Sequence, residues 1–343
     1  MIVPSPTQVF AERPRARGAR GRIGVGIVMA VLLCGALSVA CRRKEAPSPA
    51  ESARSTAPPK VPGEPAEPSI RPAAEEGREP FSGMDEPRDA TVDDRGRVWV
   101  ADFGNSRVRV FDAAGGYLGG WGNPGNETYT LRQPAGIASR GEDLYVADTW
   151  NGRIQYFTSA GEWKATAAGF FGPRGVAAAP DGRVWITDTG NHKIVVFNRA
   201  LGEPRPIGKL GPGPGEFSSP VGIAAGPGGK IYVADIGNRR IEVLDGEGRF
   251  QRSLPVPGWE GAAEPFLEVA DSGAIYVSNP NAGTVLELGS TGDLRNTWSA
   301  GEDGKPFARP TGVAFDRRQG ILYVVNSASN VVSKVRVTAA KKP

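Results

Sequence analysis

An aspartate followed five residues later by a basic residue occurs four times in this sequence, each time with an asparagine at the third place. The pairs are Asp102 with Arg107, Asp148 with Arg153, Asp188 with Lys193, and Asp235 with Arg240. A carboxylate held beside a base is the arrangement of a general acid and its partner. It is equally the arrangement of a tight turn closed by an ion pair. The copies within the chain distinguish the two uses.

Two further copies of the same pattern have lost their charges together. Asn279 and Asn326 stand where the aspartates stand, and the matching basic places hold Thr284 and Val331. Charge that is kept or lost in pairs indicates an interaction across the turn, which contributes about 0.2–1 kcal/mol when partly exposed. We therefore predict that each aspartate lies within reach of its own turn or base, and that none of these residues is catalytic.

Residue types suited to metal or nucleophilic chemistry are few. His192 is the single histidine, and the only cysteines, Cys34 and Cys41, lie near the amino terminus. One histidine cannot form a multi-histidine zinc site, and hard cations require six or more oxygen ligands. We expect no cofactor and no metal site, and we interpret His192 as a turn residue.

Ligand contacts are expected where inward residues break the repeat. After each opening proline, four units carry glycine in the second place and two do not, which makes units one and five different. The turns between the second and third strands share a face with the loops that join the units, and they add Trp150 and Arg239. Aromatic and arginine side chains gathered on one face suit a protein or peptide contact. The alternative is that Arg88 and Glu268 only pair locally. The candidate ligand contacts are Arg88, Asp89, Arg174, Phe266, Glu268, Thr311, Trp150 and Arg239.

These candidates belong to six repeated units. The signature positions recur at intervals of 46, 40, 47, 44 and 47 residues, and a proline precedes each by 14 to 16 residues. Within a unit, short runs rich in Val, Ile and Tyr are separated by Gly, Asn and Asp, which is typical of strands and turns. Repeated four-stranded units of this length stack radially, so we predict an all-β, six-bladed β-propeller of four-stranded antiparallel blades.

The second strand of every unit supports this prediction. An aromatic residue occupies one position in all six units, and the runs VWVA, LYVA and IYVA are apolar at every step, so both faces must be covered. A further apolar residue recurs three places before the proline, and we assign it to packing. The aromatic residues are Trp99, Tyr145, Trp185, Tyr232, Tyr276 and Tyr323, and the apolar ones are Met84, Leu131, Phe170, Phe217 and Phe307.

The pattern P-x-G-(I/V)-A followed by (I/L/V)-(Y/W)-V-A-D-x-x-N-x-(R/K)-I resembles the NHL-repeat family. The likeness covers residues 81 to about 337, and units five and six depart from it. Membership would imply a six-bladed propeller. It does not settle activity, because the family contains binding scaffolds and enzymes alike.

The first 41 residues have the order of an export signal. Five arginines precede the apolar run from Ile23 to Ala40, and Cys41 follows LSVA, which resembles a bacterial lipoprotein signal whose cysteine is acylated. The alternative is an uncleaved membrane anchor, since 18 apolar residues are just long enough to span a bilayer. Either way we expect the rest of the chain in the bacterial cell envelope, facing the periplasm or the exterior.

The remaining segments complete the domain assignment: residues 1–40 signal peptide or anchor, 41–80 linker and 81–340 propeller. Residues 42–80 are rich in Pro, Ala, Glu and Ser and predict a disordered spacer. The formal charge of +4 belongs to residues 1–41, and residues 81–343 hold 29 basic and 29 acidic side chains, which argues against nucleic-acid binding.

The sequence does not determine how the last blade closes the ring. Little chain follows Val337, so the last blade either takes a strand from the stretch around Ser69 to Arg71 or Phe81, or has three strands.

The functional prediction that follows is a membrane-tethered, non-catalytic scaffold that binds a protein, peptide or glycan. The alternative is a metal-dependent hydrolase or lyase of the lactonase-like or amidating-lyase-like propeller kind.

Overall fold

The computed structural model describes residues 80–259 and 263–337. The signal and anchor prediction for residues 1–40 and most of the predicted linker lie outside the described residues. Among the described residues, no helix has the length and apolarity to cross a membrane.

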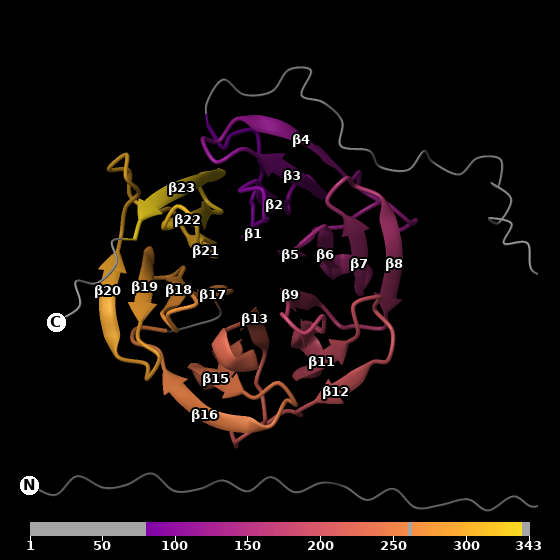
Figure 1. The fold of residues 1–343 in the computed structure, drawn as a ribbon, viewed down its shortest axis with the longest axis vertical. Helices are drawn as coiled ribbons and strands as arrows, with labels where there is room; N and C mark the ends of the chain where they lie inside the picture. The colour runs from indigo at the N-terminus through magenta and orange to yellow at the C-terminus, as the bar shows by residue number, and fades with distance from the viewer. Residues whose placement is uncertain (1–79, 260–262, 338–343) are drawn as a thin grey trace, which may run out of the picture. The chain divides into compact units, whose positions relative to one another are not determined.

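The described strands form six antiparallel sheets arranged in a ring, with the first strand of each sheet innermost (Figure 1). The predicted all-β, six-bladed propeller is therefore confirmed. Blade 1 contains β1 (Asp89–Val92), β2 (Val98–Asp102), β3 (Arg107–Phe111) and β4 (Tyr117–Trp121). Blade 2 contains β5 (Gly136–Arg140), β6 (Asp143–Asp148), β7 (Arg153–Thr158) and β8 (Trp163–Ala168). Blade 3 contains β9 (Pro173–Ala178), β10 (Val184–Asp188), β11 (Lys193–Phe197) and β12 (Arg205–Ile207).

The other three blades follow the same order. Blade 4 contains β13 (Pro220–Ala225), β14 (Ile231–Asp235), β15 (Arg240–Leu244) and β16 (Phe250–Pro255). Blade 5 contains β17 (Leu267–Val269), β18 (Ile275–Asn279), β19 (Thr284–Leu288) and β20 (Leu294–Trp298). Blade 6 contains β21 (Pro310–Asp316), β22 (Ile321–Asn326) and β23 (Val331–Arg336), so within the described ranges it is the three-stranded alternative. Short 3-10 turns join or precede strands in blades 2 to 4: η1 (Thr149–Asn151), η2 (Thr189–Asn191), η3 (Pro227–Gly229) and η4 (Ile236–Asn238).

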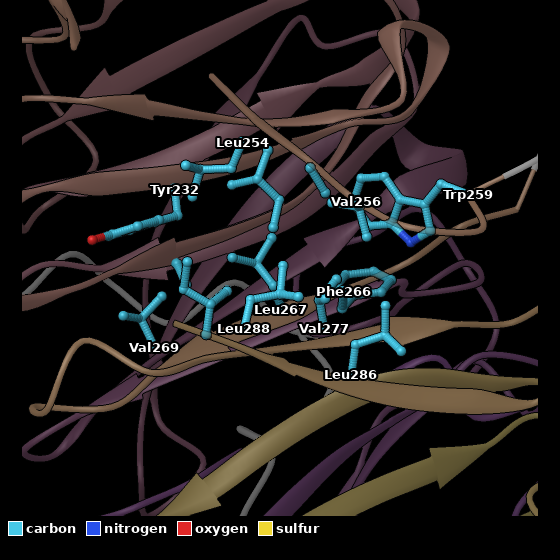
Figure 2. Packing of buried hydrophobic residues seen from close by; sticks show 14 of the residues in the cluster. Tyr232, Leu254, Val256, Trp259, Phe266, Leu267, Val269, Val277, Leu286 and Leu288 are labelled. Carbon is cyan, nitrogen blue, oxygen red and sulfur yellow. The ribbon is translucent and has the colours of Figure 1, made fainter. Parts of the chain in front are cut away.

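The core lies between neighbouring blades. The second strand of each blade is buried along its whole length, because a neighbouring blade covers each of its two faces. Figure 2 shows one such layer, where Tyr232 and Leu254 of blade 4 face Leu267 and Leu288 of blade 5. Burying such side chains stabilises the fold by about 1.5–3 kcal/mol each.

Inner strands of neighbouring blades approach closely where a glycine stands two residues after the opening proline. A Cβ on Gly136 would lie 2.0 Å from the Arg174 carbonyl oxygen, and one on Gly175 would lie 2.4 Å from the Val221 carbonyl oxygen. The glycine in the repeat is therefore required by packing around the channel.

The ring has two distinct ends. β1 begins beside the end of β2, because Asp89 pairs with Ala101. The opening prolines, the aspartate turns and the loops between blades thus share one end, which we call the signature end. The turns between first and second strands lie at the other end, which we call the opposite end.

Candidate functional site

The four signature aspartates are buried in hydrogen-bonded turns. Each is at most 1% exposed and accepts a backbone N–H from the segment that enters its blade. Each also accepts from the turn asparagine, at 2.7 to 3.2 Å. The ion pairs measure 2.7 Å for Asp102 with Arg107, 2.7 Å for Asp148 with Arg153, 3.5 Å for Asp188 with Lys193 and 3.0 Å for Asp235 with Arg240. Each carboxylate thus has the contacts predicted from the sequence, within its own blade.

The two uncharged copies keep the tie to the entering segment. The Asn326 Oδ1 atom accepts the Ala308 backbone N–H at 3.1 Å, and the Asn279 Nδ2 atom donates to the Gly258 carbonyl at 3.0 Å. An amide therefore replaces the acid where no base is available. The signature fastens the loop between blades to the sheet.

Arg88 and Arg174 lie at the signature end of the channel and bind the same acid. Arg88 donates to Glu264 at 3.2 Å and to Glu86 at 3.3 Å, while Arg174 lies 2.9 Å from Glu264. Burial lowers the pKa of Arg88, and the charges of Glu264 and Glu86 oppose that shift. The guanidinium of Arg88 also stacks 4.4 Å from the ring of Phe103. These contacts form a network that bridges blades 1, 3 and 5.

Phe266 and Thr311 are buried. Phe266 is 3% exposed and belongs to the layer in Figure 2, and Thr311 is 1% exposed with its hydroxyl donating to the Pro87 carbonyl at 3.4 Å. The register explains Phe266: it takes the place that Gly136 and Gly175 take elsewhere, because the fifth unit has one residue fewer after its proline. Neither side chain is available at the surface.

Asp89 and Glu268 line a central cavity of about 500 Å³ bounded by the inner strands of all six blades. Asp89 accepts the Ile137 backbone N–H at 3.1 Å. Glu268 accepts from Arg317 at 2.7 Å, the local pairing that the sequence left open. Burial raises the pKa of both carboxyl groups; the charge of Glu268 raises that of Asp89 further, and Arg317 opposes the shift of Glu268.

Trp150 and Arg239 are the candidates with exposed side chains at the signature end. Trp150 is 61% exposed in η1. Phe171, which is not among the candidates predicted from the sequence, is 66% exposed at the start of blade 3. The two aromatic segments are joined where the Phe170 N–H donates to the Gly152 carbonyl at 3.1 Å. A signal was present: the residue after the packing position is aromatic only at Phe171, whereas the other units carry Asp, Arg, Ser or Ala there.

His192 has a structural contact. Its Nδ1 atom accepts the Ser219 backbone N–H at 2.9 Å, which ties blade 3 to the segment entering blade 4. Among residues 80–259 and 263–337, no three His, Cys, Asp or Glu side chains are grouped to hold a metal ion.

Comparison with solved structures shows the same fold. Virginiamycin B lyase from Staphylococcus aureus aligns with a TM-score of 0.53 at 16% identity, over 75% of this chain and 98% of that one. A nidogen/laminin complex also aligns with a TM-score of 0.53 at 16% identity, over 66% and 84%. At such identities the likeness concerns the fold alone.

Comparison with sequences identifies the repeats. The NHL repeat matches residues 84–111, 131–157, 170–197 and 217–244. Human NHL-repeat-containing protein 4 is 34% identical over 109 residues, which are 30% of this chain and 83% of that protein. The chain covers only 16% of human NHL repeat-containing protein 3, at 39% identity over 61 residues, which are 18% of this chain. It covers 24% of human E3 ubiquitin-protein ligase NHLRC1, at 30% identity over 95 residues, which are 27% of this chain. From the four matched repeats and the relative covered over most of its length, the chain belongs to the family of NHL-repeat proteins.

Proposed function

We propose that this NHL propeller is a non-catalytic scaffold that binds a protein or peptide on its signature end, across blades 2 to 4. The observation that carries the proposal is the exposure of Trp150 and Phe171, at 61% and 66%, on neighbouring blades. Large aromatic side chains are expensive to leave in water, and they dominate the energetics of protein interfaces.

The charges around the aromatic pair suggest the partner's chemistry. Arg132 precedes blade 2 and Arg239 lies in the turn of blade 4, and both are exposed with no ion pair among the described residues. The signature aspartates at this end are buried and already paired. An acidic segment with apolar side chains would complement this surface.

Site-specific photo-crosslinking tests the proposal. Replacing Trp150 or Phe171 with p-benzoylphenylalanine in cells should give the same discrete, protease-sensitive adduct on irradiation. The same probe in place of Leu294, which is 51% exposed on the outer strand β20, is the matched control and should give none. Phe171→Ala should weaken the adduct formed at position 150. Adducts that are absent, that also form at position 294, or that resist protease would contradict a protein partner; a glycosidase-sensitive adduct would indicate a glycan.

The competing enzyme hypothesis predicts a different result. A metal-dependent hydrolase or lyase would retain about one calcium or zinc ion per chain, with Asp89 and Glu268 as the acids in the channel. We expect elemental analysis of the purified chain to find less than about 0.1 ion per chain. A stoichiometric ion that Asp89→Asn removes would overturn the non-catalytic proposal.

We further propose that residues 1–41 direct export and lipid attachment at Cys41, with residues 42–80 as the spacer. The basic and apolar pattern before Cys41 supports this assignment. Metabolic labelling with palmitate should mark the wild-type chain, and Cys41→Ser should abolish the label. Cys34→Ser is the control and should keep it. An unlabelled wild-type chain that remains in the membrane fraction at full length would indicate the uncleaved anchor instead.

A further inference from the structure

Small residues line the channel at four of the six blades, and larger polar residues line it at the other two. The residue opposite the aromatic of the second strand is alanine in blades 2, 3, 4 and 6. In blade 1 it is Thr91, opposite Trp99, and in blade 5 it is Glu268, opposite Tyr276. Asp89 stands two residues before Thr91, at the place taken by glycine in blades 2, 3, 4 and 6. Acidic side chains have thus replaced the small residues of the channel wall at blades 1 and 5.

The cavity of about 500 Å³ that these residues line has an excess of negative charge. Its lining contains four carboxylates and two guanidinium groups, which gives a net charge of −2 when all are ionised. The carboxylates are those of Asp89, Asp94, Glu268 and Asp271, and the guanidinium groups are those of Arg140 and Arg317. Arg317 is engaged by two of the acids, at 2.7 Å from Glu268 and 3.2 Å from Asp271.

Asp89 differs from the four buried signature aspartates, each of which has a base beside it. It is 6% exposed, it faces the cavity, and it has no cationic partner among the described residues. Its carboxylate accepts only neutral backbone N–H groups, from Ile137 at the Oδ2 atom and from Ala90. The signature aspartates, by contrast, all have a base within 3.5 Å. A buried carboxylate without a counter-ion is costly, and a bound cation would offset that cost.

The donors present favour an ammonium group over a metal ion. The described acids do not form a group of three, and a hard cation would need six or more oxygens. An ammonium group needs only three acceptors. The inner strands are sheet edges, so their backbone carbonyls on the axial side have no partner within their own sheet and extend the supply of acceptors along the channel.

We propose that the channel binds an elongated organic polycation of the polyamine class, with one ammonium group beside Asp89 and Glu268. The ligand enters from the opposite end, since the Arg88, Glu264 and Arg174 network spans the signature end. Asp94 and Arg140 connect the channel there to a second cavity of about 400 Å³. This site is independent of the aromatic surface around Trp150.

Isothermal titration calorimetry of the full chain with spermidine tests the proposal. We expect saturable binding of one spermidine per chain at about 0.15 M salt. Asp89→Asn should weaken it at least tenfold, because the amide can still accept from Ile137 but carries no charge, and Glu268→Gln should weaken it similarly. Glu162→Gln is the matched control, since this exposed acid pairs with Lys164 away from the channel, and it should leave binding unchanged. Far-ultraviolet circular dichroism establishes that each variant is folded.

Nuclear magnetic resonance of the unaltered protein provides a second measurement that needs no variant. Because the Ile137 N–H donates to Asp89, its amide resonance should shift when spermidine is added, while the amide of Gly292 should not. Absence of saturable binding, or an equal loss with Glu162→Gln, would overturn the proposal. So would one calcium ion per chain that displaces spermidine, because the site would then be a metal site. The uncharged analogue 1,8-octanediol should not bind.

Discussion

A buried carboxylate stabilises a fold only when its lone pairs are used, and Asp148 meets this condition. It is 0% exposed and accepts hydrogen bonds from the Arg132 backbone, Asn151, Arg153 and Gln155. The sequence predicted the pair with Arg153 and its structural role. It did not predict the hydrogen bond from the Arg132 backbone N–H. Almost every residue has such a group, so residue types do not show that these two residues, 16 apart in the sequence, are in contact.

Removing this carboxylate should cost more than a surface ion pair. We expect Asp148→Ala to lower the free energy of unfolding by about 3–5 kcal/mol, because it leaves Arg153 and several donors without an acceptor. Urea unfolding measures the change. The exposed acid Glu162 is the control, and Glu162→Ala should change the free energy by less than about 0.5 kcal/mol. Equal effects from both would mean that the turn is only a surface pair.

A second acid near the signature turn of blade 4 should make stability depend on pH. Glu242 is 0% exposed, and burial raises its pKa to about 7, although Arg240 lies 2.6 Å away. The unfolded chain loses this proton near pH 4.3. The folded state therefore holds a proton that the unfolded state has lost, and this group lowers the free energy of unfolding as pH rises from about 4.3 to about 7.

Glu242→Gln tests that dependence. The variant cannot titrate, so its stability relative to the wild type should improve between pH 5 and pH 8. Urea unfolding at both pH values measures the difference. Glu287→Gln provides the comparison with a half-buried acid, because Glu287 lies half-buried on β19 and burial raises its pKa as well. A relative stability that stays constant or falls would show that Arg240 holds Glu242 ionised throughout.

The inner strands set the positions of the channel residues. The sequence located these strands from the proline and the glycine that follows it. In unit five the second residue after Pro265 is Leu267, but the structure puts Phe266 at the place that glycine takes in the other blades. A one-residue slip exchanges the two faces of a strand, so residue counting cannot replace the register.

The close approach of inner strands gives a prediction about Gly136. A Cβ there would lie 2.0 Å from a backbone oxygen, which cannot move away as a side chain can. We expect Gly136→Ala to lower the free energy of unfolding by about 3 kcal/mol, at the upper end of overpacking effects. Thermal or urea unfolding measures it. Gly246→Ala is the control, because the nearest atom to its Cβ is the flexible end of Arg183, and it should change stability by less than about 0.5 kcal/mol. A tolerated Gly136→Ala would mean that neighbouring inner strands can separate.

The ring closes where blade 6 meets blade 1, the two blades that are farthest apart in the sequence. The sequence offered Ser69 to Arg71 or Phe81 as a strand. Ser69 to Arg71 lie outside the described residues, and Phe81 contributes a side chain and not a strand. The Tyr323 hydroxyl and the Lys334 ammonium both donate to the Ala113 carbonyl, at 3.3 and 3.4 Å. Such contacts join parts of the chain more than 200 residues apart, so no local pattern could reveal them.

Phe81 lies at the centre of this closure. It is 1% exposed, and its ring centroid lies 5.3 Å from that of Phe111 in blade 1 and 5.7 Å from that of Tyr323 in blade 6. Phe81→Ala should therefore lower the free energy of unfolding by about 3–5 kcal/mol and speed amide hydrogen exchange in β22 and β23. Phe171→Ala removes the same ring from an exposed site and should change stability by less than about 0.5 kcal/mol. If Phe81→Ala left exchange in blade 6 unchanged while blade 1 alone loosened, the two blades would be held together by their inner strands, and the outer seam would contribute little to closing the ring.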